Sequence, residues 1–194
     1  PKAAKYVNSP ETPLFHKSRI LYALDRARRA IVNAEQREAI VCEGQIDVIR
    51  CHSVGIENAV AAQGTAFTHD HAAILKRYAD SVVIVFDSDK AGQDAAIKTA
   101  QIFIESGMAV RVAALPSGSD PDSYIIEKGA EAFQKLVKNA VSAVGFQVSV
   151  LAGRENTKSE IGTMRTARAV LETVTRSTSA VQRAKLIQEA AERL

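Results

Sequence analysis

The residues Ser81-Val82-Val83-Ile84-Val85-Phe86-Asp87-Ser88-Asp89 give the clearest indication of the fold class of this chain. Its first six residues are apolar apart from the leading serine and rich in β-branched side chains. Such a run predicts a strand that is buried on both faces, as strands are in a parallel sheet covered by helices. Two carboxylates follow the strand at once. In open parallel sheets, functional side chains gather at the carboxyl ends of the strands, so Asp87 and Asp89 become the first candidates for a site.

The regions around this strand alternate between strand and helix patterns. Further strands are expected over 38–42, 58–61 and 110–115. Helices are expected over 18–31, 46–52, 68–78 and 90–105. Strands that alternate with helices predict parallel pairing through right-handed crossovers, and therefore an α/β fold with an open parallel sheet flanked by helices.

The character of the chain changes after Pro116. From there on only helical patterns are evident, with breaks near Gly129, Gly153 and 177–179. We therefore predict an α/β domain over 37–116 and an all-helical subdomain over 117–194, preceded by a basic linker and helix over 1–36.

Composition places the chain among ordinary globular proteins. It has 194 residues, of which 46% are hydrophobic and 24% charged, and no stretch approaches the roughly 20 apolar residues of a membrane helix. The two cysteines, Cys42 and Cys51, lack C-x-x-C spacing. We expect reduced thiols, no zinc site in this chain, no association with a membrane and a cytoplasmic location. The chain starts without Met or an apolar leader, so we expect a piece of a longer protein.

Basic residues crowd the first part of the chain, although the net charge is only +3. They are Lys17, Arg19, Arg26, Arg28, Arg29 and Arg37. Two interpretations stay open. The run is either a solvated helix face or a surface that contacts the nucleic-acid backbone, since sequence-independent binding requires neutralised phosphates.

Carboxylates follow three of the four predicted strands. They are Glu43 and Asp47, then Asp87 and Asp89, then Asp120 and Asp122. Each has a structural explanation taken singly, because Asp89 and Asp120 suit helix N-caps and Asp47 suits a first helical turn. Together they would repel one another at one sheet edge, and Mg²⁺ relieves such repulsion. We predict Asp87 and Asp89 as primary ligands, with Glu43 as ligand, proton acceptor or both.

A glutamate after the first strand and a D-x-D after a later one resemble the Toprim domain of primases, topoisomerases and some nucleases. Further motifs resemble bacterial DnaG-type primases in particular. They are the segment Tyr6–Lys17, the turn Gly64-Thr65-Ala66, the run Phe86-Asp87-Ser88-Asp89-Lys90-Ala91-Gly92, and Leu115-Pro116 followed by Asp120-Pro121-Asp122. The resemblance extends from about residue 6 to 129. Family members commonly have an aromatic residue where Gln45 stands and glycine where Ser88 stands.

The resemblance implies synthesis of short RNA primers on single-stranded DNA from ribonucleoside triphosphates, by nucleotidyl transfer with Mg²⁺ or Mn²⁺. It assigns metal binding and catalysis to Glu43, Asp87 and Asp89. Supporting acids would be Asp47, Asp120 and Asp122, nucleotide contacts Asn8 and Lys17, and template contacts Arg26, Arg28 and Arg29. Region 1–36 would belong to an upstream polymerase subdomain. Zinc and the replicative helicase would bind regions absent from this chain, so we expect it to prime poorly alone.

Three other functions are compatible with a Toprim-like sequence. A topoisomerase would need a reactive tyrosine among Tyr6, Tyr22, Tyr78 and Tyr124, and none has a recognisable topoisomerase context. A nuclease would cut DNA in Mg²⁺ without nucleotides. A non-catalytic module would bind nucleotides or a partner without turnover.

Overall fold

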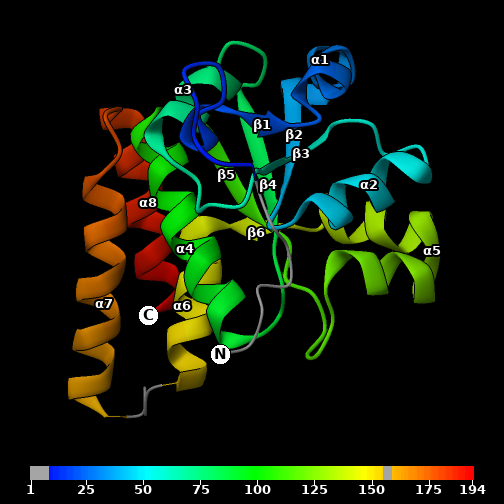
Figure 1. Ribbon diagram of the computed structural model, residues 1–194. Coiled ribbons are helices and arrows are strands. Elements are labelled where there is room, and N and C mark those ends of the chain that lie inside the picture. Colours follow the sequence, from blue (N-terminus) through cyan, green and yellow to red (C-terminus); the bar gives the residue numbers. More distant parts are fainter. Residues whose placement is uncertain (1–8, 155–158) are drawn as a thin grey trace.

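The fold is built on one mixed sheet. The computed structural model describes residues 9–154 and 159–194. Within these residues the sheet has six strands in the order β1-β3-β2-β4-β5-β6. The strands are β1 (Leu21–Tyr22), β2 (Glu38–Cys42), β3 (Ala59–Ala62), β4 (Ser81–Val85), β5 (Ala109–Val112) and β6 (Val141–Ser142). The four central strands are parallel, whereas β1 and β6 pair antiparallel at the two edges (Figure 1).

The predicted central strand has the surroundings that its sequence demands. Every residue of β4 is buried, and β4 lies between β2 and β5. The observed sheet differs from the predicted one in two ways. The short edge strands β1 and β6 were not predicted, because two residues are too few to show a period. The fourth strand ends at Val112 and not at residue 115.

The helix expected over 18–31 was partly wrong. It begins only at Leu24, after a 3₁₀ turn and β1. Ala23 adopts a left-handed backbone with φ of 63°, which interrupts a helix. The apolar spacing that suggested one long helix therefore covers two elements, because Leu21 faces the core from β1 and Ala27 and Ile31 face it from the helix.

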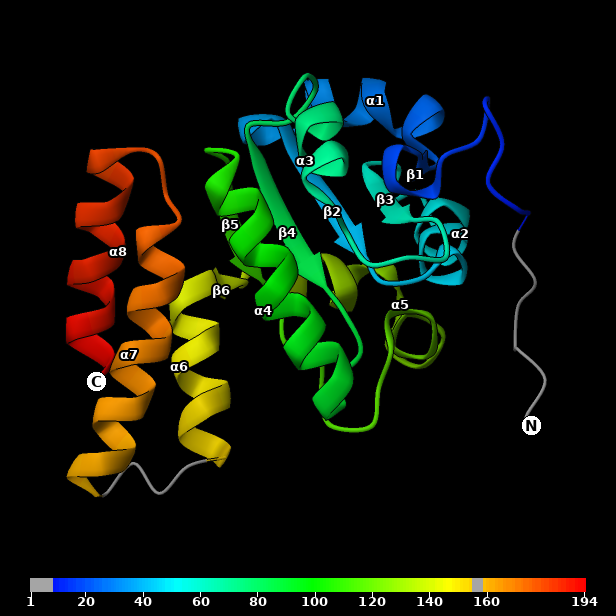
Figure 2. The same cartoon turned by 60° about the vertical axis from the view of Figure 1, so that its left-hand side comes forward.

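Helices cover both faces of the sheet and form a bundle beside it. They are α1 (Leu24–Asn33), α2 (Gln45–Ser53), α3 (His69–Leu75), α4 (Lys90–Glu105), α5 (Pro121–Lys138), α6 (Ala143–Arg154), α7 (Glu160–Thr175) and α8 (Ala180–Arg193), with 3₁₀ turns η1 (Lys17–Arg19) and η2 (Glu35–Arg37). Figure 2 shows α6, α7 and α8 standing together past the β5–β6 edge. None of the described helices is long and apolar enough to cross a membrane.

Two hydrophobic cores hold these layers together. On one face, Ile31 of α1, Leu75 of α3 and Phe103 of α4 pack against the sheet. On the other face, Val48 of α2 and Phe133 of α5 do the same. A smaller cluster joins α6, α7 and α8. These packed layers fix the carboxyl ends of β2 and β4, where the candidate site lies.

The helical half has the breaks that its sequence predicts. Gly129 has a φ of 84° inside α5, α6 ends at Arg154, and residues 177–179 separate α7 from α8. The predicted domain limits at 36 and 116 stay predictions. Helix α5 packs on the sheet beside α2, and β6 extends the sheet from within the helical half.

Candidate active site

Strand register brings the first acids together. Cys42 at the end of β2 is paired with Val85 at the end of β4, so Glu43 leaves the sheet one position before Asp87. Loss of solvation raises the pKa of the Glu43 carboxyl, and the nearby charges of Asp87 and Asp89 raise it further, while a hydrogen bond from the Asp87 backbone opposes this. The three predicted ligands therefore share one electrostatic environment.

The D-x-D loop is held by the start of α4. Asp89 is the N-cap of this helix, and its Oδ1 accepts a hydrogen bond of 2.7 Å from the Gly92 backbone N–H. A Cβ on Gly92 would lie 2.3 Å from the Asp87 carbonyl oxygen, closer than any real contact. Glycine is required there because the helix passes directly against the backbone of the loop.

Ser88 connects the D-x-D loop to the loop before α5. Its hydroxyl donates to the Ser119 carbonyl at 2.9 Å and accepts from the Ser119 N–H at 3.0 Å. The Ser88 N–H also donates to the same carbonyl at 3.1 Å. This departure from the family glycine thus adds side-chain hydrogen bonds between the loops that carry Asp87 and Asp120. The departure is visible in the sequence, whereas its partner Ser119, 31 residues away, is not.

The supporting acids have structural partners. Asp120 caps α5 by accepting from the Ser123 N–H at 2.7 Å. Asp122 forms an ion pair with Arg50 at 2.6 Å, a partner that sequence analysis missed because it comes from α2, 72 residues away. Asp47 is buried and accepts from the N–H groups of Gly44 and Asp122. Burial raises the pKa of Asp47 to about 6.

The donor set suits a hard cation. No three His, Cys, Asp or Glu side chains converge closely enough to hold one ion together within residues 9–154 and 159–194. Mg²⁺ does not require such a cage, since it takes one or two carboxylates and keeps several waters. Asp87 and Asp89 lie close enough to Glu43 for their charges to raise the pKa of its carboxyl. Their assignment as metal ligands stays a prediction.

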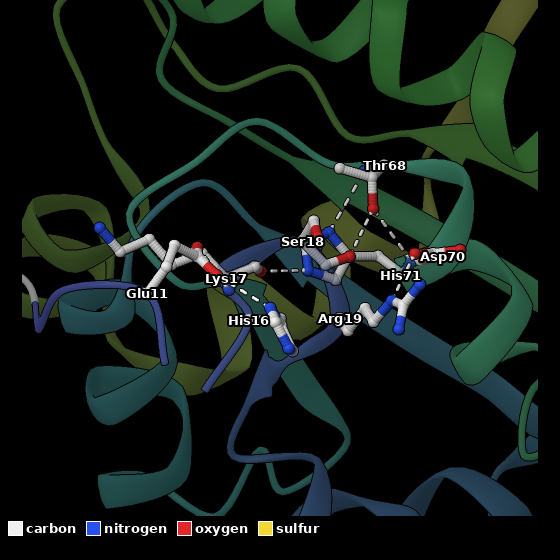
Figure 3. A network of polar contacts seen from close by, with 8 residues as sticks. All are labelled: Glu11, His16, Lys17, Ser18, Arg19, Thr68, Asp70 and His71. Carbon is white, nitrogen blue, oxygen red and sulfur yellow. Dashed lines mark hydrogen bonds and ion pairs between the residues drawn. The ribbon is translucent and has the colours of Figure 1, made fainter. Parts of the chain in front are cut away.

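Lys17 lies in the turn η1, and side chains hold its backbone on both sides. Its N–H donates to Glu11 Oε1 at 3.0 Å, and its carbonyl accepts from His71 Nε2 at 2.8 Å (Figure 3). The Lys17 ammonium has no hydrogen bond or ion pair with another residue in the part that the structure describes. Asn8, the other predicted nucleotide contact, lies outside the described residues.

The predicted template-binding arginines lie away from the acids. Arg26, Arg28 and Arg29 are on α1, near the amino-terminal end of the sheet (Figure 1). Two of them line a shallow depression of about 250 Å³, together with Val32, Asn33 and Tyr78. None of the three arginines pairs with another described residue. The fold thus separates an acidic edge from a basic surface at the other end of the strands.

Comparison with known proteins agrees with this arrangement. A Toprim-like family model matches residues 40–125, and the model of the DNA primase catalytic core, N-terminal domain, matches residues 1–28. The DNA primase of Clostridium acetobutylicum is 43% identical over 145 residues, which are 75% of this chain and 24% of that protein. The chain belongs to the bacterial DnaG-type DNA primase family. It spans about a quarter of the length of such curated relatives.

Solved primase structures share the fold over nearly the whole chain. A DnaG primase catalytic domain bound to single-stranded DNA has a TM-score of 0.82 at 33% identity, covering 99% of this chain and 62% of that one. The Aquifex aeolicus primase, solved with its zinc-binding and RNA polymerase domains, has a TM-score of 0.84 at 29% identity, covering 99% and 45%. The predicted fold class, a Toprim-like sheet followed by helices, is confirmed.

Proposed function

We propose that this DnaG-type chain provides the Mg²⁺-binding part of an enzyme that synthesises short RNA primers on single-stranded DNA. The observation that carries the proposal is the grouping of Glu43, Asp87 and Asp89 at the carboxyl ends of β2 and β4, where their charges raise the pKa of Glu43. The matching family models and the relatives named DNA primase support it.

In this proposal Asp87 and Asp89 hold Mg²⁺, or Mn²⁺ in its place, and Glu43 is a further ligand or accepts a proton. When bound, the ion would neutralise charge on the attacking 3′-hydroxyl oxygen of the growing primer and on the leaving oxygen of the triphosphate. Asp47, Asp120 and Asp122 support the loops that carry the ligands. Lys17 contributes a positive point charge to the triphosphate, with Asn8 as a second nucleotide contact.

The template would contact the basic surface of α1, through Arg26, Arg28 and Arg29. Such contacts neutralise phosphates without reading sequence. Because this surface and the acids lie at opposite ends of the sheet, one DNA strand would have to extend along the molecule to reach both. Zinc, the helicase and efficient priming are assigned to other regions of the whole enzyme, and residues 1–36 to its upstream subdomain.

The test separates metal binding from folding. Asp89→Asn removes the charge but keeps a good N-cap for α4. We expect Mn²⁺ affinity of this chain, measured by electron paramagnetic resonance, to fall about tenfold or more. Template-directed ribonucleotide incorporation by the full-length primase should fall with it. Glu131→Gln, an exposed change on α5 away from both the acids and the arginines of α1, is the control. Wild-type metal affinity and incorporation in Asp89→Asn would contradict the proposal.

A further inference from the structure

His71 is a fully buried titratable group that the proposed function does not use. It occupies the third position of α3, where it forms a capping box with Thr68. The Thr68 hydroxyl accepts from the His71 N–H at 3.2 Å, and the Thr68 N–H donates to His71 Nδ1 at 3.2 Å. Glutamate or glutamine normally fills this position. An imidazole differs from glutamate because it has a second nitrogen on its far side.

The capping box fixes the state of the ring. Since Nδ1 accepts a hydrogen bond, the proton of the neutral ring is on Nε2, which donates to the Lys17 carbonyl at 2.8 Å. A protonated ring would direct a second N–H at the Thr68 N–H. Burial also lowers the pKa of His71, against the effects of the Lys17 and Ile20 backbone and of Asp70. The neutral ring therefore connects α3 to the η1 segment.

Other contacts hold the same segment. Thr68 Oγ1 donates to the Ser18 carbonyl at 2.7 Å, and Glu11 accepts from the Lys17 N–H. Figure 3 shows these contacts converging on the backbone of residues 17 and 18, while the Lys17 side chain extends away from them. The backbone is thus held in place, while none of residues 9–154 and 159–194 pairs with the ammonium.

An aromatic series places this anchor next to the acidic loop. The His71 ring packs edge-on against Phe67, with centroids 5.6 Å apart. Phe67 stacks on Phe86 at 6.1 Å, and Phe86 directly precedes Asp87. The ring that holds Lys17 is therefore two aromatic contacts from the D-x-D loop.

We propose that His71 is a positioning residue for nucleotide binding, which holds the Lys17 backbone so that the ammonium reaches a triphosphate bound at the acidic edge. The inference rests on the proposed function, in which Lys17 contacts the nucleotide. His71 itself touches neither nucleotide nor metal.

Three substitutions at His71 test the contributions of its two ring hydrogen bonds separately. His71→Gln can accept from Thr68 and donate to Lys17, so it should preserve the anchor. His71→Glu can accept from Thr68 but cannot donate, and His71→Met does neither. We expect the Kd of this chain for ATP, with Mg²⁺ present, to rise about tenfold in the Glu and Met variants and to stay within about twofold in the Gln variant. Mn²⁺ affinity without ATP should not change.

Lys17→Ala completes a double-mutant cycle. If His71 acts through Lys17, then His71→Met should weaken ATP binding in the wild-type background and add nothing once Lys17 is alanine. Equal weakening in both backgrounds, or loss of affinity in His71→Gln as large as in His71→Met, overturns the inference. Wild-type ATP affinity in Lys17→Ala overturns it together with the nucleotide role of Lys17, while Asp89→Asn still tests the metal site separately.

Amide hydrogen exchange gives a readout that does not depend on ATP. In His71→Met, the Arg19 N–H, which donates to the His16 carbonyl at 2.9 Å, should exchange faster than in the wild type. In His71→Gln it should stay protected. Equal protection in all variants would show that the ring does not hold the segment.

Discussion

The acidic edge and the Lys17 segment contribute to the same proposed site but are positioned in different ways. Glu43 and Asp87 directly follow neighbouring strands, so backbone register sets their separation. Lys17 lies in a three-residue turn that is held by the side chains of Glu11 and His71. Backbone hydrogen bonds tolerate most side-chain changes, whereas a side-chain anchor depends on the chemistry of one residue.

The largest effect is expected at Gly92, where the acidic edge has no space for a Cβ atom. In Gly92→Ala the new Cβ would lie 2.3 Å from the Asp87 carbonyl oxygen, so either α4 or the D-x-D loop must move. We expect the free energy of unfolding, measured in urea, to fall by about 3 kcal/mol, with loss of Mn²⁺ affinity. In Gly153→Ala, where nothing lies within 4 Å, stability should be unchanged or higher. Equal stability of the two variants would refute this account.

A smaller effect is expected for the side-chain bonds of the acidic edge. Ser88→Ala removes both hydroxyl contacts with Ser119 but keeps the backbone bond. We expect a loss of about 1 kcal/mol in urea unfolding and a modest loss of Mn²⁺ affinity. Ser81→Ala, at the first residue of β4, also loses a hydroxyl contact and should leave Mn²⁺ affinity unchanged. A loss of Mn²⁺ affinity in Ser81→Ala as large as in Ser88→Ala would show that the Ser88–Ser119 bonds have no specific effect on the acids.

The smallest effect is confined to acid pH and concerns the Lys17 segment. Burial lowers the pKa of His71 below its ordinary value of 6.5. The unfolded chain therefore binds a proton before the folded one, so the contribution of His71 to stability is present above pH 6.5 and is lost as pH falls through its folded pKa. The free energy of unfolding should decrease less between pH 7.5 and 5 in His71→Gln than in the wild type. Identical slopes would contradict a neutral buried ring.

Local sequence predicted most of the regular elements. The strand after residue 80, the helix Lys90–Glu105 and the cap at Thr68 all lie where their patterns predicted, because a buried parallel strand and a capped amphipathic helix have distinctive local signals. The two-residue edge strands were missed, since their pairing with β3 and β5 involves residues far away in the chain. The prediction of one long N-terminal helix was wrong, because no local sequence pattern indicates the left-handed backbone of Ala23.

The amino-acid sequence was sufficient to predict that the acids lie together, because the carboxyl ends of parallel strands lie at one edge of the sheet, and its motifs also indicated the family. The tertiary structure supplied the partners of the side chains around the site, since the Arg50–Asp122 pair and the Ser88–Ser119 bonds join residues 72 and 31 positions apart. It also separated the arginines of α1 from the acids and brought His71 to Lys17. Hydrogen-bond partners across such separations depend on packing, which no local pattern contains.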